Sequence, residues 1–108
     1  MALNPLLDSR DQRFVLFEVL EADKLNQYEK FADFDRDTYE ATLDLAEQIA
    51  VEQVYPANAD ADKTGAKYDP VTKTVSVPEG FHTAMKSYRE AGFSGLSNGP
   101  EFGGTGMP

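Results

Sequence analysis

The residues Gly95-Leu96-Ser97-Asn98-Gly99 match the Gly-x-Ser-x-Gly pattern in which serine hydrolases expose a nucleophile between a strand and a helix. That chemistry needs an acidic residue and a histidine later in the chain to activate the hydroxyl group. No histidine or aspartate follows Ser97, and Pro100 with further glycines stands where the helix would begin. We interpret the match as fortuitous and predict no catalytic residue in this chain.

Two acidic runs resemble the start of a calcium-binding loop. Asp33, Asp35 and Asp37 alternate as the first ligands of such a loop do, but Thr38 replaces the glycine at position six and Asp44 replaces the final glutamate. A second run with the same spacing also lacks the glycine and comprises Asn58, Asp60 and Asp62. Helix capping explains the first run and linker solubility the second, with weak calcium binding as the alternative.

The single histidine, His82, has no second metal-ligand type clustered near it. A zinc site needs three or four converging ligands, so we predict an ordinary surface or half-buried histidine and no metal site. The chain contains no cysteine, which excludes disulfides, thiolate metal sites and a cysteine nucleophile.

A glycine-rich stretch ends the sequence. Phosphate-binding loops are followed by a helix, often with a lysine, and neither follows Gly103, Gly104 and Gly106. Disordered tails lack large apolar residues, whereas this stretch carries four of them: Phe93, Leu96, Phe102 and Met107. Because glycines allow close backbone approach, we predict that the loop packs on another surface and that the chain is the front piece of a larger protein.

The charge of the chain is strongly acidic and unevenly distributed. The formal net charge is −9, of which −8 belongs to residues 1–56. This disfavours nucleic acid and anionic membrane as partners, since both require Lys or Arg to neutralise phosphate. No apolar run is long enough for a membrane span and the N-terminus lacks the layout of a signal peptide, so we expect a cytoplasmic protein.

Two capping boxes predict helices in the first half of the chain. Ser9 to Gln12 precedes the apolar segment Arg13 to Leu20, which indicates a short helix buried on both faces. Asp37 to Glu40 opens a long helix that we expect to end at Tyr55, before Pro56. One or two helical turns lie between them, marked by apolar residues spaced by three: Leu25, Tyr28, Phe31 and Phe34. The long helix carries a wide apolar stripe, formed by Leu43, Leu45, Ala46, Ile49, Ala50, Val51 and Val54.

The second half is predicted to contain a linker, a hairpin and a third helix. Residues 58–67 are polar and read as a surface linker, and residues 67–77 as a hairpin that turns at Asp69-Pro70. Pro78 suits the first position of a helix that Gly92 closes. Its expected buried face comprises Phe81, Ala84 or Met85, Tyr88 and Ala91. The fold class is therefore mainly α, a small helical domain of three or four helices with one short β-hairpin.

Four segments in this order resemble the N-terminal part of flavin-dependent acyl-CoA dehydrogenases and cover nearly the whole chain. They are Arg10 to Leu20, the long helix ending in Tyr55-Pro56, Tyr68 to Phe81, and Glu90-Ala91-Gly92-Phe93 leading to Pro100 to Pro108. The first is similar to an extension found in a bacterial subgroup that includes broad-range and methylmercaptopropionyl-CoA dehydrogenases. The last matches the family's alanine-glycine followed by proline-glutamate-aromatic-glycine-glycine.

The resemblance implies a three-part parent enzyme that holds FAD between a middle β domain and a carboxy-terminal helical bundle. A glutamate in the carboxy-terminal part abstracts the α-proton of an acyl-CoA thioester while the flavin takes the β-hydride. The implied partners of the parent enzyme are its acyl-CoA substrate and electron-transfer flavoprotein. Residues 1–34 correspond to an N-terminal extension and residues 35–108 to the helical domain, which stops before the flavin-binding domain.

On this resemblance no catalytic or flavin-binding residue lies in the 108-residue piece, which we expect to be inactive alone and to bind no cofactor. Its expected role is to wall the acyl pocket, through Phe102, Gly103, Gly104 and Met107. We also expect self-association of the isolated piece, since orphaned apolar interfaces associate. The alternative is a free-standing acidic helical module for protein interaction.

Overall fold

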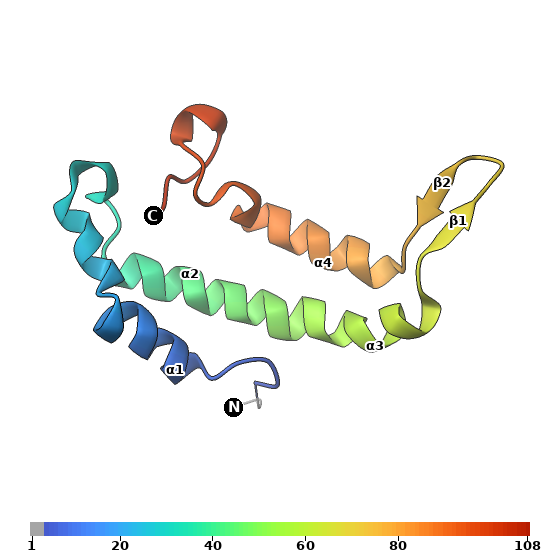
Figure 1. Ribbon diagram of the computed structural model, residues 1–108, viewed down its shortest axis with the longest axis horizontal. Coiled ribbons are helices and arrows are strands. Elements are labelled where there is room, and N and C mark those ends of the chain that lie inside the picture. Colours follow the sequence, from blue (N-terminus) through green and yellow to red (C-terminus); the bar gives the residue numbers. More distant parts are fainter. Residues whose placement is uncertain (1–3) are drawn as a thin grey trace.

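One long helical rod forms the axis of the molecule (Figure 1). In this computed structural model, which describes residues 4–108, the rod consists of α2 (Arg36–Ile49), a π-helical segment (Ala50–Val54) and α3 (Tyr55–Thr64). Helix α4 (Glu79–Glu90) runs along one side of the rod, and α1 (Ser9–Arg13) lies along the other (Figure 1). We call residues 4–34 the N-terminal segment; its last part passes around the end of the rod at which α2 begins.

Short helical turns and one hairpin connect these elements. The hairpin consists of β1 (Lys67–Asp69) and β2 (Thr74–Ser76), paired antiparallel with Tyr68 opposite Val75. The shorter turns are a π-helical segment at Phe14–Val19 and 3₁₀ turns at Ala22–Gln27, Glu29–Phe31, Phe93–Gly95 and Pro100–Phe102. The predicted fold class, a mainly α domain with one short hairpin, is confirmed.

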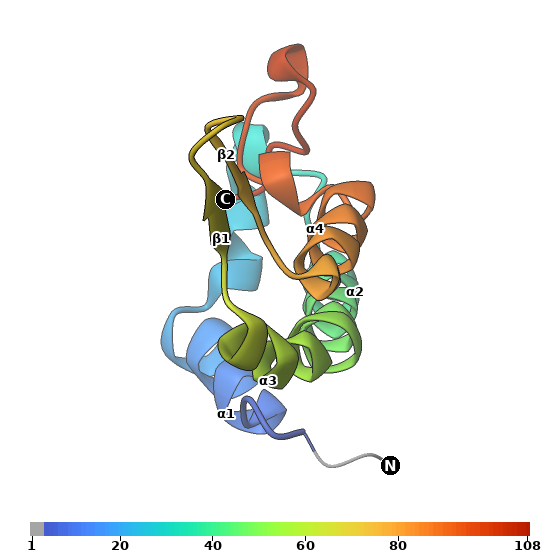
Figure 2. The same ribbon diagram turned by 90° about the vertical axis from the view of Figure 1, so that its right-hand side faces the viewer.

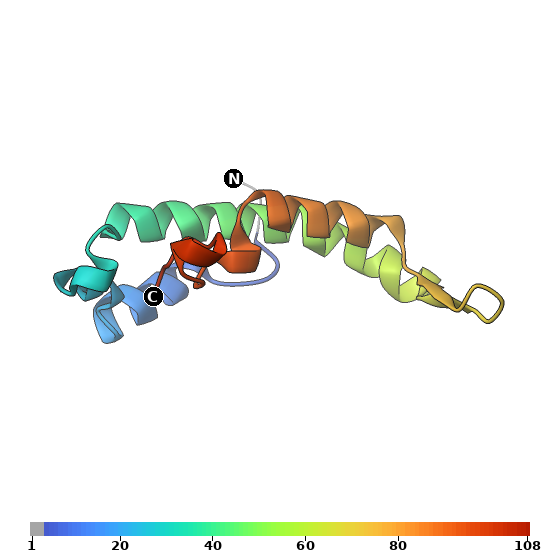
Figure 3. The ribbon, with the colours of Figure 1, turned by 90° about the horizontal axis from the view of Figure 1, so that it is seen from above.

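The molecule is a flat slab. Its extents are 55 × 38 × 19 Å, and its thin dimension is plain in the views along the rod and from above (Figures 2 and 3). A helix with its side chains is about 10–12 Å thick, whereas the slab is 19 Å thick. There is therefore too little depth for most helices to be covered on both faces. Its radius of gyration is 17.6 Å, whereas a compact chain of this length has a value of about 13 Å.

Both predicted N-caps are wrong by one or two residues. Asp8, not Ser9, caps α1 by accepting hydrogen bonds from the backbone N–H groups of Arg10 and Asp11. Asp35, not Asp37, caps α2 through the N–H of Thr38. In each case an aspartate one or two residues before the predicted cap is the actual cap, and its short carboxylate reaches the free N–H groups of the first turn.

The predicted end of the long helix at Tyr55 is wrong, as is the surface linker from residue 58. Helix α3 continues to Thr64 and ends at Gly65, whose φ of 69° is left-handed. Proline normally stops a helix because its ring collides with the carbonyl four residues earlier. The π-helical segment before Pro56 changes this spacing, since the N–H of Tyr55 donates to the carbonyl of Ala50, five residues back.

Helix α4 packs closely on α3 through small residues. A Cβ atom added to Gly80 would lie 2.8 Å from the Cβ of Ala57, and Ala61 and Ala84 are buried. Gly92 adopts a φ of 84° and closes α4 as predicted. Pro78, expected as the first helical residue, is instead the N-cap.

The predicted buried faces are largely exposed within this chain. Among the described residues the buried apolar side chains are Phe17, Ala61, Ala84 and Met107. In the segment expected to be buried on both faces, Phe14 is 49 % exposed and Leu20 is 64 % exposed. The predictions are right for Phe17 and Ala84, which are buried. They are wrong for the exposed side chains, because none of the described residues covers the second face of these helices.

The hairpin and the 3₁₀ turns agree with prediction. Asp69 accepts backbone hydrogen bonds from Val71 and Thr72 and so holds the Asp-Pro turn; these bonds also lower the pKa of its carboxyl group. The apolar spacing of three in residues 25–34 fits the three residues per turn of a 3₁₀ helix. No helix in residues 4–108 combines the length and the apolar character that crossing a bilayer requires. Residues 1–3 of the expected N-terminal extension lie outside the described residues.

Candidate functional site

An apolar groove runs along α4 where it faces the π-helical segment of the rod. It has a volume of about 620 Å³, and we call it the α4 groove; its lining residues are Val54, Val77, Phe81, His82, Ala84, Met85 and Tyr88. Phe81 and Met85 are each 47 % exposed. The groove therefore contains most of the α4 face that the sequence predicted to be buried, together with Val54 of the rod and Val77, which follows strand β2.

The glycine-rich loop, residues 99–108, is folded by its own backbone hydrogen bonds. The N–H of Gly104 donates to the carbonyl of Gly99, that of Thr105 to Gly95, and that of Met107 to Leu96, over 3.0–3.2 Å. The N–H of Gly103 donates to the carbonyl of Pro100. These amides are therefore occupied and do not form a nest that binds phosphate.

Glycine is required in this loop for two different reasons. Gly103 and Gly106 have φ values of 80° and 77°, which side chains rarely adopt. At Gly104 a Cβ atom would overlap the backbone carbonyl of Asn98. The loop therefore depends on glycine for its turns and for the close approach of Gly104 to the backbone of residues 95–98.

The four predicted wall residues lie on this loop but do not face one way. Met107 is only 6 % exposed, and its sulfur lies 3.9 Å from Oγ1 of Thr42 in α2. Phe102 is 81 % exposed, and Gly103 is exposed beside it. Gly104 lies between them and is half-buried. The loop thus presents Phe102 outward while Met107 attaches it to the rod.

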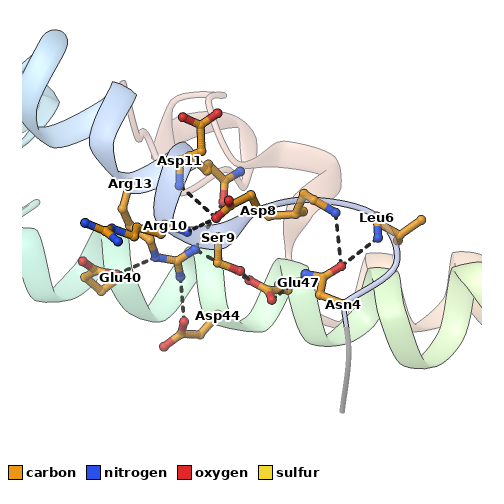
Figure 4. A network of polar contacts seen from close by, with 12 residues as sticks. Asn4, Leu6, Asp8, Ser9, Arg10, Asp11, Arg13, Glu40, Asp44 and Glu47 are labelled. Carbon is orange, nitrogen blue, oxygen red and sulfur yellow. Dashed lines mark hydrogen bonds and ion pairs between the residues drawn. The ribbon is translucent and has the colours of Figure 1, made fainter. Parts of the chain in front are cut away.

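A network of polar contacts holds the N-terminal segment on α2 (Figure 4). The guanidinium of Arg13 lies 3.0 Å from Glu40, 2.7 Å from Asp44 and 3.6 Å from Glu47. The Arg13 side chain is only 16 % exposed, and those of Glu40 and Glu47 are 34 % and 25 % exposed. These two ion pairs are therefore better shielded than ordinary surface pairs, which contribute about 0–1 kcal/mol, whereas Asp44 is 75 % exposed. Arg13 thereby fixes α1 at one position along the rod.

Glu47 gathers the second half of this network. Its carboxylate accepts hydrogen bonds of 2.6 Å from the hydroxyl of Ser9 and from the side-chain amide of Asn4 (Figure 4). The Ser9 hydroxyl, then the Asn4 amide, and more weakly the charge of Arg13 lower the pKa of Glu47. Ser9, expected to cap its own helix, instead binds a residue 38 positions later.

Sequence reasoning missed this network and the breadth of the α4 groove. A signal was present for the first: Glu40, Asp44 and Glu47 are spaced by four and three, which places them on one face of a helix. Such an acidic face attracts a basic partner, and Arg13 supplies it. For the groove, Val54 and Val77 are far apart in the chain, and no local pattern joins them.

The remaining candidate residues serve structural or solvent-exposed roles. Ser97 is exposed in a turn between two 3₁₀ segments, without the strand and helix that a nucleophile elbow needs. Asp35 caps α2, and its hydrogen bonds from the N–H and the hydroxyl of Thr38 lower the pKa of its carboxyl group. His82 is exposed on α4 at the groove. Asp60 accepts a 3.3 Å hydrogen bond from Thr64 within α3.

The described residues do not fit a metal ion or a flavin diphosphate. Within residues 4–108 no three His, Asp or Glu side chains converge as a metal site would require. A diphosphate binds at helix N-termini through free N–H groups. Here α2 begins with Asp35 and Asp37 and α4 with Glu79, and these carboxylates repel an anion. The loop amides of Gly103, Gly104, Thr105 and Met107 are also occupied.

Comparisons with known proteins identify the family. The chain is 34 % identical over 99 residues to the broad-specificity linear acyl-CoA dehydrogenase FadE5 of Mycobacterium tuberculosis. It is 33 % identical over 101 residues to butyryl-CoA dehydrogenase of Syntrophomonas wolfei, and 25 % identical over 99 residues to 3-methylmercaptopropionyl-CoA dehydrogenase of Ruegeria pomeroyi.

Each match covers 92 % of this chain and 16 % of the relative. No protein-family model matches the chain. The chain thus spans about one sixth of the length of these relatives, and the matches agree with the resemblance carried by the four sequence segments. The chain belongs to the acyl-CoA dehydrogenases, of which it corresponds to the N-terminal part.

Proposed function

We propose that this chain is the N-terminal helical part of an enzyme that desaturates acyl-CoA thioesters with FAD. Residues 1–34 form an extension and residues 35–108 the helical domain proper. The cofactor and the catalytic base belong to other parts of the parent enzyme, and electron-transfer flavoprotein accepts its electrons in the cytoplasm. The contribution of this chain is to wall the acyl pocket and to exclude water from it.

The observation that carries this proposal is the uncovered apolar surface of the slab. The accessible surface of the chain is 8183 Å², roughly 2,200 Å² more than a compact protein of 11.9 kDa exposes. This excess is larger than the ~800 Å² that each partner buries in a standard interface. The α4 groove is its most apolar described portion, and a further part of the same enzyme is the occupant that the family match supports.

Within this arrangement the glycine-rich loop supplies the pocket wall. Phe102 and Gly103 are exposed on the loop, so they are free to face a neighbouring domain or an acyl chain. Gly104 and Met107 hold the loop in shape and attach it to the rod. Phe102 is therefore the residue of the four that we assign to direct contact with substrate.

The experiment is a substitution in the full-length parent enzyme. We expect Phe102→Ala to lower kcat/KM for long acyl-CoA substrates by about tenfold, since removal of apolar pocket contacts costs on the order of 1–3 kcal/mol. The matched control is Tyr68→Ala on the hairpin, an aromatic residue that is 61 % exposed and outside the loop. Equal effects of the two changes would contradict the assignment of Phe102.

The division of labour with the rest of the enzyme has its own test. The 108-residue chain, purified alone and incubated with FAD, is expected to retain no flavin and to oxidise no thioester. Stoichiometric flavin binding with thioester oxidation by this chain would contradict the proposal.

A further inference from the structure

The N-terminal segment and the glycine-rich loop share one socket, although they stand at opposite ends of the chain. Around a cavity of about 300 Å³ the structure places three groups of mostly apolar side chains. The N-terminal segment contributes Leu16, Phe17, Ala22 and Leu25; the rod contributes Tyr39, Thr42 and Leu43; the C-terminal segment contributes Leu96, Met107 and Pro108. Phe17 and Met107 are two of the buried apolar residues of the chain, each 6 % exposed.

The N-terminal side of this socket is fastened at two points. Arg13 is paired with the acidic face of α2, as described above. Four residues later, Phe17 stacks edge-on against Tyr39 with ring centroids 6.3 Å apart, and the guanidinium of Arg36 lies 4.4 Å over the Phe17 ring. The N-terminal segment is thus a firm wall of the socket rather than a loose cover.

The loop side of the socket has few other attachments. The backbone hydrogen bonds of the loop join it to itself and to the adjoining residues 95–96. A side-chain hydrogen bond reaches the rod from Met107 itself, whose sulfur accepts from Oγ1 of Thr42 over 3.9 Å. Phe102 extends into solvent. Burial of Met107 is therefore the principal contact that sets the position of the loop relative to α2, and four of the ten residues that line its socket come from the N-terminal segment.

We propose that the N-terminal segment, through Arg13 and Phe17, is a positioning element for the glycine-rich loop. Loosening this segment opens the socket of Met107 and releases the loop from the rod. The consequence for the acyl pocket rests on the proposed function of the loop, whereas the coupling between the two ends of the chain does not.

The coupling is tested by amide hydrogen exchange on the 108-residue chain. Arg13→Gln is expected to raise the exchange rates of the Thr105 and Met107 amides about tenfold while the amides of α4 keep their protection. The matched control is Arg10→Gln, which removes an exposed arginine from the same helix and is expected to change neither. Unchanged exchange at Thr105 and Met107 in Arg13→Gln would overturn the proposal.

A second variant guards against general unfolding. Phe17→Leu keeps most of the apolar volume but removes the ring contacts with Tyr39 and Arg36, so it weakens the socket without charge effects. Faster exchange confined to the N-terminal segment and the loop supports the proposal. Uniform loss of protection that includes α4, or no change at the loop, contradicts it.

The full-length enzyme then separates this inference from the function of the loop. We expect Arg13→Gln to alter KM across a series of acyl-CoA chain lengths more than it alters kcat, because it moves a pocket wall and touches no reacting atom. Coupling by hydrogen exchange with unchanged selectivity would contradict the pocket-wall role of the loop and leave the positioning of the loop supported. Changed selectivity without coupling would overturn the positioning inference.

Discussion

Phe102 and Met107 stand five residues apart on one loop and have opposite environments. The side chain of Phe102 is 81 % exposed and that of Met107 is 6 % exposed. Gly103 and Gly106 lie between these two residues, and both have a positive φ. One loop thus carries an internal anchor and an outward aromatic group.

The first prediction follows from this contrast. Met107→Ala is expected to lower the free energy of unfolding of the chain by about 2–4 kcal/mol, because it leaves a cavity in the socket. Phe102→Ala is expected to change it by less than about 0.5 kcal/mol, since its ring is in solvent. Urea titrations followed by circular dichroism measure both values. Similar destabilisation by the two changes would show that Phe102 is packed in solution.

The second prediction concerns the glycines of the loop. Gly104→Ala is expected to lower the melting temperature by about 4–8 °C or more, the shift that 1 kcal/mol produces in a domain of this size. The reason is that the new Cβ would overlap the backbone carbonyl of Asn98, and backbone atoms cannot rotate away as the end of a side chain can.

The matched control is Gly99→Ala. The atoms nearest its Cβ would be those of the Glu101 carboxylate, which is exposed and can rotate away, and the φ of Gly99 is −62°. Scanning calorimetry of the two variants makes the comparison. A large loss at Gly99, or none at Gly104, would contradict the loop geometry.

The third prediction concerns acid sensitivity. The Ser9 hydroxyl, the Asn4 amide and the charge of Arg13 hold the pKa of Glu47 below its usual value of 4.5. A lowered folded-state pKa stabilises the fold above pH 4.5, and this contribution is lost as the pH falls through the lower folded value. The urea concentration at the midpoint of unfolding should therefore fall more steeply between pH 6 and pH 3 in the unsubstituted 108-residue chain than in its Glu47→Gln variant.

The comparison with Glu47→Gln isolates one carboxyl group. Asp35 and Asp69 also have lowered pKa values, through bonds to Thr38 and Val71 respectively, and they contribute to the acid slope of both proteins. Only the difference between the two slopes belongs to Glu47. Identical slopes would mean that the network of Figure 4 does not persist in solution.

The fourth prediction concerns self-association through the α4 groove. The isolated chain is expected to form dimers or larger species and to bind an apolar dye, because uncovered apolar grooves attract one another. Met85→Glu places a charge inside the groove and should shift the chain to monomer with weaker dye binding. Val71→Glu on the hairpin turn, where Val71 is 88 % exposed and outside the groove, is the matched control.

Sedimentation velocity and dye fluorescence measure this fourth outcome. If the unsubstituted 108-residue chain is monomeric at high concentration and binds no dye, the prediction that the α4 groove needs a partner is contradicted. Equal effects of the two glutamate substitutions would point to net charge rather than to the groove.

Local chemistry allowed much of the secondary structure to be predicted. Asp69-Pro70 marked the hairpin turn, and Gly92 marked the end of α4, because each acts through its own backbone preferences. The backbone preference of Pro56 also led to the wrong prediction that the long helix ends at Tyr55. Its usual effect on a helix was expected, but the π-helical segment before it removed the clash.

Long-range contacts were beyond prediction from the sequence. The pairing of Arg13 with Glu40 spans 27 residues, and the socket joins Phe17 to Met107 across most of the chain. Apolar spacing also could not distinguish a face buried within the chain from one that awaits a partner. Phe81 and Met85 obey the pattern of a buried face and are half exposed.

The sequence by itself determined the helical character, the hairpin and the family, because these depend on capping, turn chemistry and the order of short motifs. Only the tertiary structure decided which apolar faces meet, since burial depends on the neighbours that folding brings together rather than on spacing along a helix. It showed that Met107 is buried against the rod while Phe102 is exposed, and that the face of α4 is uncovered. The fold therefore decides that Met107 anchors the loop, that Phe102 is free to contact another surface, and that the α4 groove is exposed.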